Sequence, residues 1–152
     1  MRRLIVMATA LFTTTAWASP EDAKLSMIAF SAWECHVYAN RAGDQAESER
    51  LFILGMETAK EFVVKLKAGE ISKQDTFQHS PMAVMNLMQG PNNDFILGRF
   101  YELVASSSFE KITQKDSAGQ QMEWKDWITD PATIRSIAET KFRQANCSMI
   151  KR

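Results

Sequence analysis

The sequence has little cysteine, histidine and proline, and it lacks the common catalytic motifs. Its 152 residues include two Cys, two His and four Pro. Without a Cys-x-x-Cys pair it has neither a thioredoxin-type redox motif nor a c-type haem attachment site. A phosphate-binding loop, a dinucleotide-binding glycine pattern, a Gly-x-Ser-x-Gly elbow and a His-Glu-x-x-His motif are also missing. We therefore expect no catalytic residues and a chain that is not an enzyme.

An excess of positive charge is also missing, and this bears on the class of partner. The chain has 18 basic and 18 acidic residues and no basic run. Nucleic-acid binding depends on clustered Lys and Arg that neutralise phosphates, so we expect no nucleic-acid partner. Outside the first 18 residues no apolar segment reaches the roughly 20 residues that a bilayer requires, so we expect no transmembrane segment in the mature chain.

What the first 18 residues do contain is the pattern of a secretory signal peptide. Basic Arg2 and Arg3 precede an apolar run over 4–12 and an Ala-x-Ala ending at Ala18. This order predicts cleavage after Ala18 and export to the periplasm or beyond. Loss of two arginines leaves 16 basic against 18 acidic residues, a net charge of −2. The remaining residues, 19–152, have the length of one domain, and we expect no cofactor in it.

The two cysteines, Cys35 and Cys147, are expected to form a disulfide because an exported protein matures under oxidising conditions. The bond would join the first predicted helix to the last. Cys147 lies off the apolar stripe of its helix, so we expect that helix to fray or rotate at its end.

Apolar residues at steps of three and four predict an all-α fold, a compact bundle of four or five helices built on antiparallel helical hairpins. A first helix runs from Ser19-Pro20 to Gly43, and a second runs from the cap Asp44 to Gly69. Gly55 inside the second helix predicts close approach of a neighbouring helix, which would offset its poor helix propensity.

The second half of the chain predicts shorter helices. They cover 82–89, from Asn92 or Asn93 to about 106–108, and from Asp130-Pro131 to about Cys147, and a helical turn follows Ser72. The stretch 109–124 fits a β-hairpin or a loop, with the loop favoured. The letters Phe-Ile-Leu-Gly occur at 52–55 and again at 95–98, which indicates either a repeat or chance.

Three groups of residues are candidate binding sites. Met82, Met85 and Met88, with His79 before them, are soft ligands that would suit Cu(I), although methionines also fill irregular cores. Arg99 and Tyr101 follow the start of the helix predicted from Asn92 or Asn93, where an anion or a partner would bind. The alternative is an ordinary helix cap followed by a surface Arg. Trp124 and Trp127 are either interface anchors or a lid over the core.

These features favour an exported, non-catalytic interaction protein of the periplasm whose partner is another protein. An inhibitor, an immunity-type protein and an envelope-assembly factor all fit this class. The partner-binding candidates are Arg99, Tyr101, Trp124 and Trp127. The alternative is a periplasmic copper-binding protein that uses His79 and the three methionines.

Overall fold

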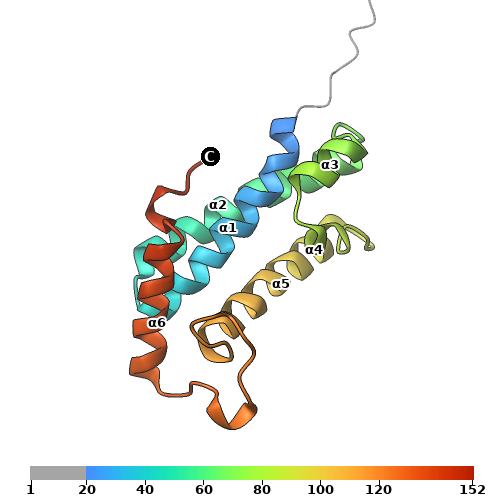
Figure 1. Ribbon diagram of the computed structural model, residues 1–152. Helices are drawn as coiled ribbons and strands as arrows, with labels where there is room; N and C mark the ends of the chain where they lie inside the picture. Colours follow the sequence, from blue (N-terminus) through green and yellow to red (C-terminus); the bar gives the residue numbers. More distant parts are fainter. Residues whose placement is uncertain (1–19) are drawn as a thin grey trace, which may run out of the picture.

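The computed structural model describes residues 20–152, and over that range the protein is helical without a β-strand (Figure 1). The predicted signal peptide, 1–18, and the predicted cap Ser19 lie outside the described residues. Four long helices build the frame, and two short ones follow the second of them. The all-α prediction is confirmed.

The first two helices form the predicted antiparallel hairpin (Figure 1). α1 spans Pro20–Ala42 and α2 spans Gln45–Lys67. Gly43 takes φ +87° at the turn, which glycine adopts at no steric cost. The Asp44 carboxylate caps α2 by accepting the Glu47 amide at 3.1 Å. The Asp44 amide already donates to the Ala39 carbonyl, so the Glu47 side chain bonds to Arg50 instead of completing a capping box.

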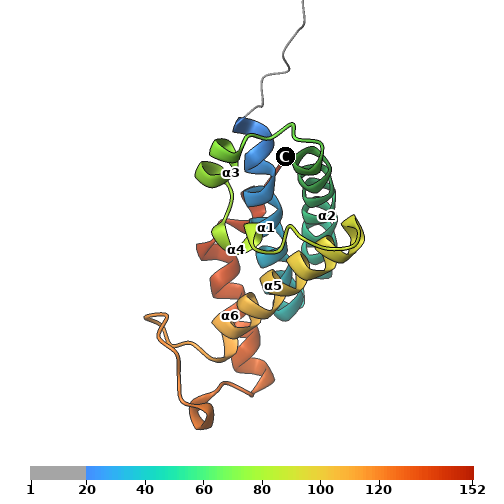
Figure 2. The ribbon, with the colours of Figure 1, turned by 90° about the vertical axis from the view of Figure 1, so that its right-hand side faces the viewer.

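α5, Asn93–Thr113, crosses this hairpin and closes the first half of the core (Figure 2). Trp33 of α1 is fully buried and meets Phe100 edge-on, with ring centroids 5.0 Å apart. Gly55 of α2 lies directly against the Trp33 indole. The predicted close approach at Gly55 is therefore confirmed, and the neighbour is α1.

α6, Pro131–Gln144, packs on α1 and leads to the second cysteine of the disulfide. Cys35 and Cys147 are bonded, with Cα atoms 5.5 Å apart, so the predicted disulfide is confirmed. The helix ends before Cys147, and Asn146 adopts the left-handed conformation with φ 52°. A 3₁₀ turn, η2, follows over Cys147–Met149. This reversal turns the Cys147 side chain inward, as its position off the apolar stripe predicts.

The predicted helix over 82–89 is too long. α3 covers Lys73–His79 behind its cap Ser72, and α4 covers only Met82–Met85. After Met85 the backbone continues in tight turns, in which the amides of Leu87 and Met88 donate three residues back. Gly90-Pro91 follows, and proline cannot continue a helix.

The predicted end of the fourth helix near 106–108 is also wrong, because α5 continues to Thr113. Serine disfavours helix interiors when its hydroxyl competes for backbone groups. Here the hydroxyls of Ser107 and Ser108 both donate to the Val104 carbonyl, one helical turn back. Ile112 is fully buried beyond them, and its burial favours the extra turn.

Candidate functional site

The segment 114–130, here called the α5–α6 loop, projects from one end of the bundle (Figure 2). The loop favoured for 109–124 is confirmed from 114 onward, whereas 109–113 belongs to α5. One isolated bridge joins Lys115 to Gln121 without forming strands. Asp116 organises the turn between them. Its Oδ1 accepts the amides of Ala118 and Gln120 at 2.9 and 2.8 Å.

Further backbone bonds hold the rest of this loop. The Met122 amide donates to the Gln114 carbonyl, and the Ile128 amide donates to the Thr113 carbonyl, each at 2.8 Å. The 3₁₀ turn η1, Trp124–Asp126, lies between these two anchors. The loop is therefore tied to the end of α5 before and after its tip, and its shape does not depend on a partner.

The two tryptophans occupy the projecting part of the loop. The Trp124 side chain is 81% exposed, so it does not form a lid over the core. Trp127 is 42% exposed and its Nε1 donates to the Met122 carbonyl at 3.4 Å. A large indole left in water is the residue type that most often anchors a protein interface.

The charge of the loop is negative. Four acidic and two basic residues lie within 114–130, a net charge of −2. Lys125 pairs with Glu123 at 2.9 Å, whereas Asp126 makes no ion pair within residues 20–152. Asp130 caps α6, and hydrogen bonds from Thr133 lower the pKa of its carboxyl. The tip around Trp124 thus combines one large apolar side chain with an acidic surround.

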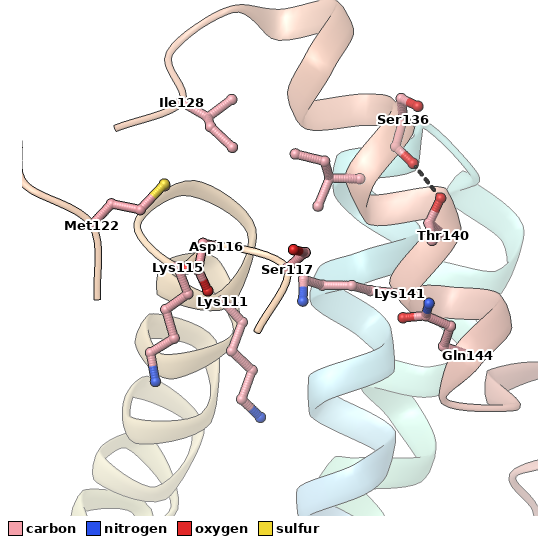
Figure 3. A pocket seen from close by; sticks show the side chains of 11 residues that line it. Lys111, Lys115, Asp116, Ser117, Met122, Ile128, Ser136, Thr140, Lys141 and Gln144 are labelled. Carbon is pink, nitrogen blue, oxygen red and sulfur yellow. Dashed lines mark hydrogen bonds between the residues drawn. The ribbon is translucent and has the colours of Figure 1, made fainter. Parts of the chain in front are cut away.

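A cavity of about 320 Å³ lies under the base of the loop, against α6 (Figure 3). Its wall includes three lysines, two of which are Lys115 from the turn and Lys141 from α6. The third, Lys111, is neutralised by Glu34 of α1 at 2.5 Å. Ile128 and Met122 supply apolar wall. The wall also includes Asp116, so the cavity places charged groups of both signs next to apolar surface.

Arg99 and Tyr101, the other predicted partner-binding residues, do not lie with the tryptophans. Arg99 stacks over Phe95 at 5.6 Å and donates to the Gln89 carbonyl at 3.2 Å. It is 14 residues before the end of α5, which corresponds to about 21 Å of helix. The predicted set therefore divides, and only Trp124 and Trp127 share a surface.

Tyr101 belongs to a buried polar cluster that sequence reasoning missed. Its hydroxyl contacts His36 Nε2 at 3.1 Å, and His36 Nδ1 lies 3.0 Å from the Ser48 hydroxyl and 2.9 Å from the Ser48 carbonyl. Ser48 and His36 are both buried, so a substrate does not reach this serine and histidine together. The cluster links α1, α2 and α5. Neighbours 65 positions apart leave no local signal in a sequence.

The predicted copper ligands also divide. Met82 and Met85 line an apolar groove whose wall does not include Met88, and Met85 and Met88 both pack against the core. His79 is the last residue of α3 and is not part of the groove wall. Copper binding by these four residues stays a prediction.

Residues 20–152 contain no cluster of three or more His, Cys, Asp or Glu side chains arranged to hold a metal ion. None of their helices combines the length and apolarity needed to cross a bilayer. No protein-family model matches the chain, and no curated protein or solved structure is significantly similar to it.

Proposed function

We propose that the chain is an exported, non-catalytic protein-binding module of the periplasm that engages its partner through the α5–α6 loop. The observation that carries the proposal is the 81% exposed Trp124 at the tip of a loop held by its own hydrogen bonds. Burying such a side chain against a partner stabilises a complex by several kcal/mol. In the free protein the same indole is exposed, so it contributes no free energy of burial.

The hydrogen bonds within the loop support this function. Ordering a flexible loop on binding costs free energy, and a loop already held in shape avoids much of that cost. The anchors at Thr113 and Gln114 and the turn at Asp116 hold this loop without a partner. A projecting loop of this kind fits a concave surface, as when an inhibitor or immunity-type protein occupies the site of an enzyme.

The negative charge of the α5–α6 loop narrows the class of partner further. The loop carries a net charge of −2, and Asp126 beside Trp124 has no ion pair in the described part of the chain. Complementary charge guides association and penalises wrong partners. We therefore expect a partner with an apolar slot for an indole, surrounded by Lys or Arg.

The predicted signal peptide and the disulfide support the location. A disulfide over 112 residues persists where thiols are not kept reduced. Fractionation of the producing cell and N-terminal sequencing test this part. We expect the protein in the envelope fraction, beginning at Ser19, and recovery from the cytoplasm with Met1 intact would contradict it.

Photo-crosslinking tests the loop. A photoreactive phenylalanine analogue replaces Trp124 in one variant and Glu57, an exposed residue of α2, in a control. We expect the first variant to give one discrete crosslinked partner in living cells and the control to give none. Equal products from both positions would contradict the proposal.

Affinity for the purified partner gives the quantitative test. Removing an interface tryptophan costs at least about 2 kcal/mol, which corresponds to a roughly 30-fold rise in Kd for Trp124→Ser. Met149→Ser is the matched control, because Met149 is 70% exposed on η2. It should change Kd less than twofold. A Kd unaffected by Trp124→Ser would refute the role of the loop.

A further inference from the structure

A second concave surface lies in the part of the molecule formed by α2, α3 and α4, and the proposed partner loop does not use it. This groove, here called the α2–α4 groove, is lined by residues from the end of α2, the chain after it, α3 and α4. Its volume is about 620 Å³, within the range of small-molecule sites. The apolar residues of its wall are Leu66, Ile71, Phe77, Met82 and Met85.

Large apolar side chains of this groove remain in water. Phe77 is 73% exposed and Met82 is 58% exposed. α4 is a single turn whose one buried residue is Val84, so it covers little of the surface beside it. Methionine side chains are flexible and adapt to ligands of irregular shape. A ligand with an apolar chain would remove this surface from water.

The hydroxyl groups of the groove wall are already engaged. Ser72 Oγ donates to Asp75 and accepts its amide, Thr76 Oγ1 donates to the Ser72 carbonyl, and Ser80 Oγ donates to the Ala23 carbonyl. A peptide strand in this groove would leave its own amides unpaired, which costs free energy for each buried group. The occupant should therefore have few hydrogen-bonding groups along its length.

One charge remains available. Lys73 is the only charged residue in the wall, and its ammonium makes no ion pair within residues 20–152. We propose that the α2–α4 groove binds a single-chain anionic amphiphile, whose hydrocarbon chain lies against Phe77 and the methionines while its carboxylate or phosphate pairs with Lys73. The Lys73 stem is apolar enough to lie along the chain while its ammonium meets the head group.

Titration calorimetry of the mature, oxidised protein tests this proposal. Dodecanoate is the probe, used below the concentration at which it forms micelles, and dodecanol and dodecyltrimethylammonium are the neutral and cationic comparisons. We expect one dodecanoate to bind per chain, and both comparisons to bind several-fold more weakly. No heat with dodecanoate, or equal affinity for all three probes, would overturn the proposal.

Two variants and their controls assign the binding to the groove. Lys73→Gln should weaken dodecanoate about fivefold, the size expected for a partly exposed ion pair, and leave dodecanol unchanged. Lys60→Gln, on the exposed face of α2, should change neither. Phe77→Ser should weaken both probes about tenfold, whereas Met149→Ser should not. Because Phe77 is exposed, its substitution leaves the fold intact.

Vesicles distinguish a free amphiphile from a membrane lipid. Binding to phosphatidylglycerol vesicles and to free dodecanoate, with the same dependence on Lys73, would support recognition of an anionic head group by Lys73, whether that head group belongs to a membrane lipid or to a free amphiphile. Binding to vesicles without binding to dodecanoate would mean adsorption to a charged surface and would overturn the groove proposal. The proposal would also be overturned if the protein bound a peptide helix with an apolar face but did not bind dodecanoate, and if Phe77→Ser left the affinity for that helix unchanged.

Discussion

Two glycines that follow the same three letters should respond in opposite ways to the same substitution. Phe-Ile-Leu-Gly occurs at 52–55 in α2 and at 95–98 in α5. A Cβ atom added at Gly55 would lie 2.5 Å from Cδ1 and 2.6 Å from Nε1 of Trp33. A Cβ atom added at Gly98 would meet nothing within 4 Å. We predict that Gly55→Ala destabilises the protein and that Gly98→Ala stabilises it.

The magnitudes follow from three effects. Alanine in place of glycine favours a helix by about 1 kcal/mol, and this gain applies at both sites. At Gly55 the fully buried Trp33 must move, and overpacking of this kind costs about 1–3 kcal/mol. Movement of the indole also weakens its 3.3 Å hydrogen bond to the Phe52 carbonyl and its contact with Phe100, which adds about 1 kcal/mol. The net expectation is a loss of about 1–3 kcal/mol at Gly55 and a gain of about 0.5–1 kcal/mol at Gly98.

Urea unfolding followed by circular dichroism measures both changes in the free energy of unfolding. The midpoints should move in opposite directions while the slope with urea stays constant, since a constant slope shows that the change is in stability. Gly55→Ala as stable as the parent protein would refute the reasoning, because it would mean that Trp33 does not pack against Gly55. A marked loss at Gly98 would equally refute the open surroundings described for it.

Three further predictions test other parts of the structure. The double variant Cys35→Ala, Cys147→Ala should lose up to about 5 kcal/mol of unfolding free energy, since the bond closes a loop over 112 residues. Thiol titration of the unfolded, unreduced parent protein should find no free thiol. Burial, followed by the charge and hydrogen bond of Glu34, raises the pKa of Tyr38 far above its ordinary value, and burial raises the pKa of Tyr101. Unfolded phenols ionise near pH 10, so the unfolding free energy should fall above about pH 10, with Tyr38 contributing up to about 1.4 kcal/mol per pH unit. Urea titrations of Tyr38→Phe should show a shallower fall, whereas an unchanged slope would contradict the assignment. Asp116→Ala removes the acceptor of two loop amides, so hydrogen exchange at the amides of Ala118 and Gln120 should accelerate. The free energy of unfolding of the whole protein should change by less than about 0.5 kcal/mol. Unchanged exchange would argue against a turn held by this carboxylate.

Much of the helical frame could be predicted from local patterns. Asp44, Ser72, Asn92 and Asp130 each cap the helix that follows them, and their positions in the sequence predict where those helices begin. The paired cysteines predicted the bond, and the position of Cys147 off its stripe predicted that the last helix would fray or rotate near it; the helix ends at Gln144, before Cys147. Helix ends were less predictable. At Ser107 and Ser108 the composition favoured an end, and burial of Ile112 overrode it.

The candidate sites were predicted only in part. The sequence singled out Trp124 and Trp127, but their separation from Arg99 depends on the length and direction of α5. The α2–α4 groove has no sequence signature, because its wall is assembled from the end of one helix, a connection and two short helices. The methionines suggested a metal, and only their placement beside Phe77 and Lys73 indicated an apolar groove.

The repeated Phe-Ile-Leu-Gly separates what the local sequence determines from what tertiary packing decides. By itself the sequence determined that both copies are helical, since helix formation depends on neighbours within a few residues. Which face of each copy meets the core was decided only by tertiary packing. Gly55 is buried against Trp33 while Gly98 is exposed, and Ile53 is half exposed while Ile96 is fully buried. The burial pattern differs because each helix is rotated to suit partners distant in the chain, and no four-residue pattern carries that information.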